Sequence, residues 1–341
     1  MRTRLRAAGP CLLLALTVPL AGCTGSSPHP AHSSSSPPGD SSPAAAGQSV
    51  TPAISLAAAR SLLRRYVRVN NAANARLNPR LEAKVEGPPQ LTVDEAGYVV
   101  ARHTRTSIKP FTYRRRAFYI PALAATAQRW FAVSATTGSG GHAERQFLLF
   151  VQQYSRGPWK VDSVVVSAGG DLPVTLGPTG TAMAGTAGDR HLAVAPSDLP
   201  ATHAEYINSK HHRSAAGFAA GRWTSTLVQG IRSFSKDYTK AGWKYDDRWA
   251  AVGAPVYVLR SKDGGAVVWY FLKDQQSATR MTSGRPLHSG TVVEALAGTS
   301  QINHRFTIIS ASAFVAVIPP KGKGKIVVTG GATGNVGAST S

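Results

Sequence analysis

Mostly apolar residues recur at steps of three and four over residues 56–77, which is the spacing of one face of an α-helix. The positions are Leu56, Ala59, Leu63, Tyr66, Asn70, Ala73 and Leu77. Thr51 is a suitable N-cap residue, and Pro52 fits the first turn of a helix. The pattern predicts a long amphipathic helix that begins at residue 51 and ends near Asn78, or continues with a kink toward Gly87.

A second helix and four strands are predicted next. Thr92 and Glu95 have the spacing of a capping box within a helical segment at residues 91–102. Beyond this segment the period changes to two, which is typical of strands. The predicted strands are residues 111–120, 129–136, 145–154 and 159–166. Ser-Arg-Gly-Pro at residues 155–158 predicts a hairpin turn between the last two strands.

The second half of the chain repeats this order, helix before sheet. Asp198 or Thr202 can cap a helix that extends to His212, whereas residues 217–231 are less regular. Strands are predicted at residues 243–250, 255–259, 266–272, 306–318 and 325–328. Asp263-Gly264-Gly265 predicts a hairpin between the second and third of these strands.

These patterns predict an α+β protein of two domains, each with a helix followed by a curved antiparallel sheet. The first domain is residues 51–168 and the second is residues 201–330. Residues 169–200 are rich in Gly, Thr, Ala and Pro, which predicts a linker between the domains, with a short β-arm at residues 192–195.

The segment of residues 325–337 is a predicted strand followed by Gly-x-x-Gly-x-x-Gly. It resembles the opening of an extended short-chain dehydrogenase, in which the glycines approach a pyrophosphate inside a βαβ unit. Only four residues follow Gly337, so no helix, second strand or ribose-binding acid is available. We therefore expect no nucleotide cofactor, and a disordered tail at residues 331–341.

The amino-terminal segment predicts where in the cell the protein is located. Three arginines precede a short apolar run at residues 11–20, which is too short to stay in a membrane as a spanning helix. Leu20-Ala21-Gly22-Cys23 follows and resembles the lipobox of bacterial lipoproteins at all four positions. The sequence thus predicts a signal peptide at residues 1–22 and lipid attachment at Cys23. An ordinary secretory signal with an accidental cysteine is the alternative.

Residues 23–50 are predicted to be a disordered tether, because Ser, Pro and Ala dominate and almost nothing apolar is available to bury. A glycosylated Ser/Pro stalk is the alternative. We expect the protein to be lipid-anchored on the extracytoplasmic face of the cell membrane. Cys11 leaves with the signal, so the mature body contains no disulfide.

Charge is the strongest remaining signal. The formal net charge is +21, and removal of the three signal arginines leaves +18. Arg60, Arg64 and Arg68 repeat at four-residue spacing on the first predicted helix, which suggests an anion-binding stripe. At the predicted location the partner would be an anionic envelope polymer or another exported protein, and not nucleic acid. A solvated face that keeps the protein soluble is the alternative.

Motifs for catalysis and metal binding are absent from the sequence. We find no His-Glu-x-x-His motif, paired-cysteine site or phosphate-binding loop, so no metal and no cofactor are expected. His203, His211 and His212 are expected at the surface. A carboxylate pair is hard to assemble, because the conspicuous acids, Asp94-Glu95 and Asp246-Asp247, are adjacent and point in different directions. The sequence favours a non-catalytic binding or interaction module.

Two resemblances complete the interpretation. Residues 51–166, closing with Gly157-Pro158-Trp159-Lys160-Val161, resemble the cone-shaped α+β fold of the nuclear-transport-factor-2-like superfamily. The whole chain resembles uncharacterised two-domain lipoproteins of Streptomyces-type bacteria, which implies no activity.

The cone fold implies a pocket and hence an alternative function, an enzyme acting on a small ligand in the first domain. Asp94 and His103 would be its acid or base residues. The aromatic residues near such a pocket are expected to be core residues rather than ligand contacts. They are Tyr66, Tyr98, Tyr119 and Trp130.

Overall fold

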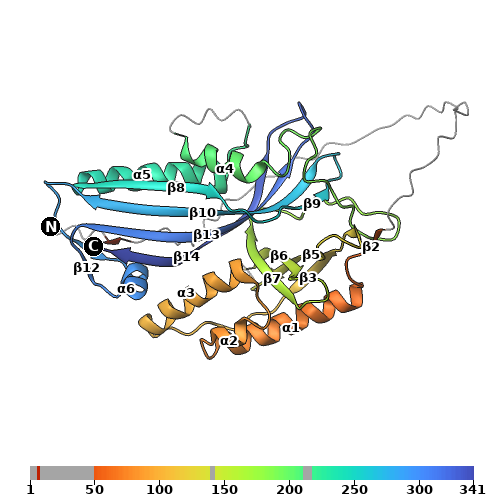
Figure 1. Cartoon of the computed structure of the whole chain (residues 1–341), viewed down its shortest axis with the longest axis horizontal. Coiled ribbons are helices and arrows are strands. Elements are labelled where there is room, and N and C mark those ends of the chain that lie inside the picture. Colours follow the sequence, from red (N-terminus) through yellow and green to blue (C-terminus); the bar gives the residue numbers. More distant parts are fainter. Residues whose placement is uncertain (1–5, 8–49, 139–142, 210–216) are drawn as a thin grey trace, which may run out of the picture.

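The computed structural model describes residues 6–7, 50–138, 143–209 and 217–341. It is an α+β structure with antiparallel sheet, as the sequence predicted (Figure 1). The predicted tether, apart from Val50, and the predicted lipid-attachment residue Cys23 lie outside the described residues, as does the signal peptide apart from residues 6–7.

The described helices fall into two groups in the sequence, before the first sheet strands and around the later ones. They are α1 (Leu56–Asn74), α2 (Pro79–Glu82), α3 (Pro88–Thr104), α4 (Leu199–Asn208), α5 (Leu227–Lys240) and α6 (Thr291–Ala297), with a π-helical turn η2 (Arg222–Thr226) before α5. The first helix starts later than predicted: Ser55 is its N-cap and accepts a hydrogen bond from the Ala58 amide, while Thr51 and Pro52 belong to a short strand.

The strands are paired antiparallel with the exception of a two-residue pair at β1. They are β1 (Arg6–Ala7), β2 (Val50–Pro52), β3 (Arg114–Tyr119), β4 (Ala122–Ala124), β5 (Trp130–Thr137), β6 (Glu144–Gln152), β7 (Trp159–Ser167), β8 (Trp243–Ala251), β9 (Tyr257–Arg260), β10 (Ala266–Arg280), β11 (Leu287–Ser289), β12 (Gln301–Ile302), β13 (Arg305–Ile318) and β14 (Val327–Thr340). Both predicted hairpins are present, β6 to β7 and β9 to β10.

One sheet runs through both halves of the chain, whereas two separate sheets were expected. Its strand order is β3-β5-β6-β7-β14-β13-β10-β8, with β9 also paired to β10. The join is short: Gly330 and Gly331 of β14 pair with Ser167 and Val166 of β7. The two halves are therefore connected by backbone hydrogen bonds as well as by the chain.

The predicted disordered tail at residues 331–341 is wrong. Residues Gly331–Thr340 continue β14 and pair along β13 as far as Phe306. The glycines allow neighbouring side chains to pack closely against the strand. A Cβ on Gly331 would lie 2.7 Å from the Phe314 ring, and a Cβ on Gly334 would lie 2.2 Å from the Val93 side chain. A sequence that resembles a phosphate-binding loop is thus a strand packed under larger side chains.

Helices cover both regions of the sheet (Figure 1). A core of aromatic and aliphatic side chains joins the two halves. The helix α1 packs on β5 and β6, while α4 and α5 pack on β8, β10 and β13. Trp130 of β5 lies 6.1 Å from Trp269 of β10 between ring centroids, although several strands separate them in the sheet. The sheet must therefore curl strongly enough for its two halves to pack together.

The segment predicted as a linker is packed rather than loose. Leu172, Val174 and Ala182 are buried in the core between the halves. Leu192, at the start of the predicted β-arm, forms an isolated β-bridge with Pro320. The domain boundaries themselves remain a prediction.

Candidate functional site

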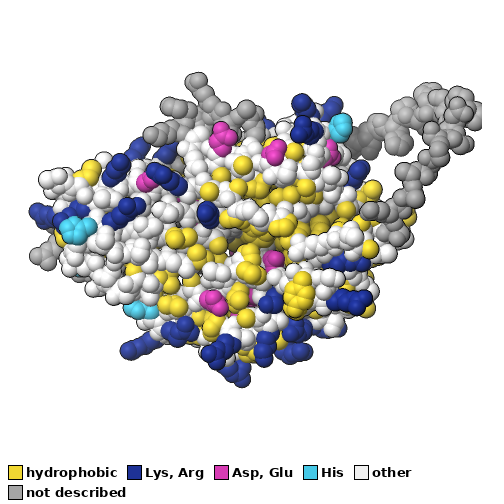
Figure 2. Space-filling view, in the orientation of Figure 1, with side chains coloured by type: hydrophobic (Ala, Val, Ile, Leu, Met, Phe, Trp, Pro, Cys, Tyr) yellow, Lys and Arg dark blue, Asp and Glu magenta, His cyan; other side chains and the backbone are white. Residues whose placement is uncertain are grey.

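Two of the three predicted anion-binding residues lie in a pocket at the edge of the first half. Arg60 and Arg64 of α1 meet Arg115 and Arg116 of β3 around a cavity of about 390 Å³, with Phe118 in its wall. We call this the arginine pocket. Figure 2 shows Lys and Arg side chains gathered along the lower edge of the molecule, over the helices of the first half.

The pocket depends on an irregular backbone in β3. Neighbouring residues of a regular strand point to opposite faces, so Arg115 and Arg116 would be separated. The register with β5 shifts between Arg114 and Ala117, and Arg115 has φ of 46°, in the left-handed region that non-glycine residues rarely adopt. This bulge brings both guanidinium groups to the pocket. A left-handed arginine costs on the order of 1 kcal/mol or more, which is typical of functional sites.

Internal charge pairing does not account for the arginine pocket. Among the described residues, no salt bridge involves Arg60, Arg64, Arg115 or Arg116. All four side chains are exposed. The third predicted residue, Arg68, is exposed on the same helix but does not line the pocket. The geometry therefore favours a four-arginine pocket over a linear stripe.

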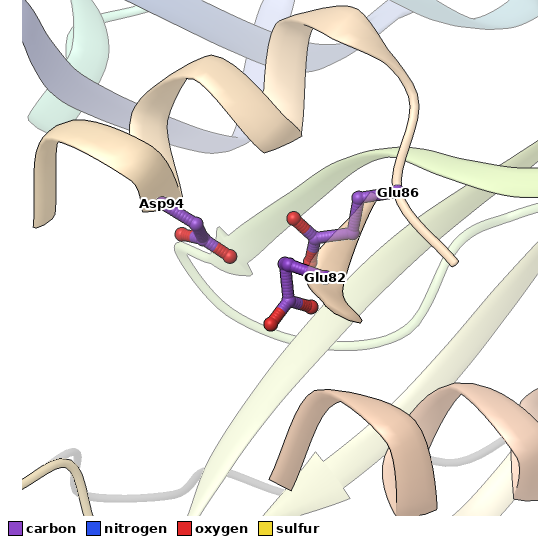
Figure 3. Close-up of side chains that lie close together, drawn as sticks. All are labelled: Glu82, Glu86 and Asp94. Carbon is purple, nitrogen blue, oxygen red and sulfur yellow. The ribbon is translucent and has the colours of Figure 1, made fainter. Parts of the chain in front are cut away.

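A second cluster is buried beside α1 and joins three carboxylates (Figure 3). Glu82 ends α2, Glu86 follows one helical turn later, and Asp94 lies on α3. The Glu86 amide donates to the Glu82 carbonyl oxygen at 3.1 Å, so the helical turn continues past α2 and places the two side chains together. One carboxylate oxygen from each residue lies within 4.8 Å of the others. We call this the carboxylate cluster.

Neutral donors hold one oxygen of each carboxylate. Glu82 Oε2 accepts from the Tyr98 hydroxyl, and Asp94 Oδ1 accepts from Gln90. Glu86 Oε1 accepts from the Tyr66 hydroxyl and the Asn70 amide, each at 3.1 Å. The other oxygens of the two glutamates, Glu82 Oε1 and Glu86 Oε2, are buried and accept from no such donor. The hydrogen bonds that remain possible are protons shared within the cluster, between Glu86 and its neighbours Glu82 and Asp94.

Burial dominates the electrostatics of the cluster. It raises the pKa of Glu86 to about 11, and repulsion from Asp94 and Glu82 adds to the effect. Burial also raises the pKa of Glu82 and of Asp94, against hydrogen bonds that lower them. Within the described part of the chain, no Lys, Arg or His forms a salt bridge with these carboxylates. Without a bound cation, the cluster must hold protons at neutral pH.

Sequence reasoning missed Glu82 and Glu86. The expectation that a carboxylate pair is hard to assemble is wrong, because it considered only acids adjacent in the sequence. The available signal was the four-residue spacing of Glu82 and Glu86 after a Pro79 helix start. Asp94, named as a residue of the alternative enzyme, does join the cluster, but its hydrogen-bond partner is Gln90 rather than a tyrosine.

The other residue of the alternative enzyme lies elsewhere. The His103 side chain is 40% exposed, and its Nε2 atom is 3.9 Å from Oε2 of Glu294 on α6. The four aromatic residues assigned to a pocket or core, Tyr66, Tyr98, Tyr119 and Trp130, are all buried.

The structure also has an apolar cavity of about 360 Å³ between the two halves. Its lining includes Pro88, Val93, Asp162, Phe271, Ala313 and Ala332. Burial raises the pKa of Asp162 to about 6, against its hydrogen bond from Gln153. Because both halves form this cavity, it differs from the first-domain pocket of the alternative enzyme, which remains a prediction.

The predicted surface position of His203 is wrong. Its side chain is buried, with Nε2 2.9 Å from the Trp223 carbonyl oxygen and Nδ1 2.9 Å from the Tyr270 hydroxyl. Since a carbonyl can only accept, Nε2 donates and Nδ1 accepts from Tyr270. Burial lowers the pKa of His203 to about 4, so it is a neutral core residue. His211 and His212 lie outside the described residues.

Comparisons with known proteins give a family but no activity. Residues 50–340 match the model of a family described as a domain of unknown function, DUF8094. An uncharacterized lipoprotein of Streptomyces coelicolor is 29% identical over 295 residues, covering 82% of this chain and 78% of that protein. An uncharacterized lipoprotein of Streptomyces avermitilis is 31% identical over 240 residues, covering 69% of each chain. No solved structure matches.

These findings confirm the resemblance to Streptomyces-type lipoproteins. The cone-fold resemblance of the first half remains a prediction. Among the described residues, no helix combines the length and apolarity needed to cross a bilayer. The lipoprotein relatives support a membrane-anchored location.

Proposed function

Because the chain belongs to the DUF8094 family, and the relatives matched here are uncharacterized lipoproteins, we propose that it is a non-catalytic binding lipoprotein of the cell envelope. In this proposal Cys23 carries the lipid, the body lies on the extracytoplasmic face, and the arginine pocket binds a phosphate-bearing anion of the envelope. The single observation that carries the proposal is the convergence of Arg60, Arg64, Arg115 and Arg116 on one cavity.

The chemistry of the pocket favours phosphate. A guanidinium group offers several N–H donors in a planar fork that matches phosphate oxygens, and it keeps its charge at every physiological pH. Four such groups without salt-bridge partners repel one another until an anion neutralises them. Phosphates repeated along a lipid surface or a wall polymer would meet this requirement.

The position of the pocket in the chain fits this role. The described body begins at Val50, and α1, which carries Arg60 and Arg64, begins at Leu56. Cys23 is 27 residues before Val50, so an anchor at Cys23 keeps Val50 within about 90 Å of the bilayer even if the tether is fully extended. The pocket would thus be built on the helix that follows the anchor most closely in the sequence, and the tether is short enough to keep it near the bilayer.

The test is binding of the full chain carrying Cys23→Ser, which cannot be acylated, to vesicles of phosphatidylglycerol and of phosphatidylcholine. We expect binding to the anionic vesicles only, weakening as salt is raised. Arg64→Gln with Arg116→Gln should lower the affinity about tenfold, because two charge-assisted contacts are lost. A soluble polyphosphate tested in parallel distinguishes a wall-type polymer from a lipid surface as the source of phosphate.

The matched control is Arg68→Gln with Arg80→Gln, which removes the same charge from exposed positions outside the pocket. It should change the affinity less than threefold. Equal weakening by both double variants would mean that net charge, and not the pocket, drives binding. Absence of binding to either anion would contradict the proposal and leave an exported protein as the partner.

The bulge at Arg115 gives a second prediction. Arg115→Gly should weaken anion binding, yet leave the protein about 1 kcal/mol more stable than Arg115→Ala, because alanine retains the strained φ and glycine does not. Both variants remove the same charge. Vesicle binding and urea denaturation of the two variants measure the two effects. Equal stabilities would show that the left-handed conformation at residue 115 carries no strain.

A further inference from the structure

The carboxylate cluster is a second site with the opposite charge. Glu82 and Glu86 are fully buried, and Asp94 is half-buried, so Asp94 is the residue of the cluster that is partly exposed to solvent. Only 17 of the 341 residues are Asp or Glu. Three of these few acids converge although the chain contains 38 Lys and Arg residues, none of which forms a salt bridge with them in the described structure.

Hydrogen bonds from neutral side chains reach only one oxygen of each carboxylate, and this arrangement points to a ligand on the remaining oxygens. Each carboxylate uses one oxygen to accept from Tyr, Asn or Gln, which carry no charge. These contacts fix the carboxylates without neutralising them. The remaining oxygens, Glu82 Oε1 and Glu86 Oε2, are buried without a donor from Tyr, Asn or Gln, so only a proton shared within the cluster or a cation can satisfy them. Leaving such acceptors unsatisfied costs about 1–3 kcal/mol each.

We propose that Glu82, Glu86 and Asp94 bind a hard divalent cation, with Ca²⁺ as the best fit. Ca²⁺ takes oxygen ligands at about 2.3–2.6 Å, so two ligands on opposite sides of the ion lie up to about 5 Å apart. One carboxylate oxygen from each of the three residues lies within 4.8 Å of the other two. Mg²⁺ demands near-ideal octahedral geometry and retains its waters more strongly, so a buried set of protein carboxylates suits Ca²⁺ better. Cysteine and histidine do not contribute to the cluster, which disfavours Zn²⁺.

This site is independent of the proposed function. The arginine pocket is formed by other residues of α1 and by β3, and the carboxylate cluster is formed by α2, the turn after it and α3. A cation would join α2 to α3, and through Tyr66 and Asn70 it would also hold α1. No metal site was expected here, because the sequence contains no metal-binding motif.

The experiment uses Tb³⁺ as a luminescent substitute for Ca²⁺, with the full chain carrying Cys23→Ser. Tyr66 and Tyr98 donate hydrogen bonds directly to Glu86 and Glu82, so a bound Tb³⁺ would be close enough to be excited through these rings. We expect sensitised Tb³⁺ emission that added Ca²⁺ abolishes, and a Tm that rises with Ca²⁺ and falls again with chelator.

Asp94→Asn is the principal variant, because Asp94 is half-buried and an amide can keep the hydrogen bond to Gln90. It should lower the affinity for Tb³⁺ and Ca²⁺ at least tenfold. Glu86→Gln should do the same, and circular dichroism will show whether it folds. The matched control is Glu95→Gln, which removes an equal charge from the next, exposed residue of α3, and should change the affinity less than twofold.

Two results would overturn the proposal. One is a wild-type chain that shows neither Tb³⁺ emission nor a Ca²⁺-dependent Tm at pH 8, which would mean that the cluster holds only protons. The other is equal weakening by Asp94→Asn and Glu95→Gln, which would place the cation elsewhere. Neither result depends on vesicle binding, so failure of the cation site and failure of the arginine pocket are distinguishable.

Discussion

Removal of residues 331–341 should prevent the protein from folding into a stable structure. These residues are most of β14, and residues 331–340 pair with Phe306 to Phe314 of β13. Gly331 is also one of the two β14 residues that pair with β7. Roughly ten backbone hydrogen bonds are lost, each with a net contribution of about 0.5–1.5 kcal/mol. A loss of about 5 kcal/mol or more is comparable with the whole stability of many domains. Thermal unfolding followed by circular dichroism measures it.

Two single substitutions in the same strand provide a gentler version of this test. Gly331→Ala places a Cβ 2.7 Å from both Phe314 and Trp223, and should cost about 1–3 kcal/mol through overpacking. Gly337→Ala meets nothing within 4 Å and should change the stability by less than about 0.5 kcal/mol. A truncated chain with the Tm of the full chain, or equal effects of the two alanines, would mean that residues 331–340 are not part of the sheet.

Asp247 should make the protein less stable as pH rises from about 4 to about 7. Burial, followed by repulsion from Asp274, raises the pKa of Asp247 from 3.8 to about 7. In this range the folded protein retains the proton that the unfolded chain has lost, so unfolding becomes more favourable as pH rises. At about 1.36 kcal/mol per pKa unit, the loss is about 4 kcal/mol. Above about pH 7 the contribution is constant.

Urea denaturation between pH 4 and 8, with chelator present, measures this slope. Asp247→Asn should flatten it and raise the free energy of unfolding at pH 8, because the amide needs no proton to be neutral. The groups beside Asp247 are Asp274, Tyr245 and the partly exposed Asp246. Asp246→Asn is the matched control, since it removes the same charge at the neighbouring position. The prediction fails if Asp247→Asn and wild type have the same slope.

The sequence predicted local structure well where the pattern is carried by large side chains. Alternation over residues 159–166 and 243–250 gave β7 and β8 with ends correct to about one residue. The predicted first helix is present, but its start was placed at Thr51 because Thr-Pro is also a plausible N-terminus. The helix α5 was missed, because residues 217–231 as a whole lack a regular period and α5 begins only at Leu227, within that segment.

Long-range pairing could not be predicted from local pattern. Glycine, which is depleted in strands, recurs over residues 329–337, and only the neighbours Phe314, Trp223 and Val93 explain why glycine is required at residues 331 and 334. The same limit applies to the arginine pocket. The sequence places Arg60 and Arg64 on one helix face, but only the bulge in β3 brings Arg115 and Arg116 to them.

The position of β14 determines when the two halves of the sheet can join. The pairing of Gly330 and Gly331 with Ser167 and Val166 connects residues more than 160 positions apart. During synthesis, β3 to β7 are complete long before β14 exists, so Val166 and Ser167 must wait for their partners, whereas Val161 of β7 already bonds to Val85 and Gly87. The join between the two halves of the sheet is therefore a late step of folding, and until then the first half is held by its own core under α1.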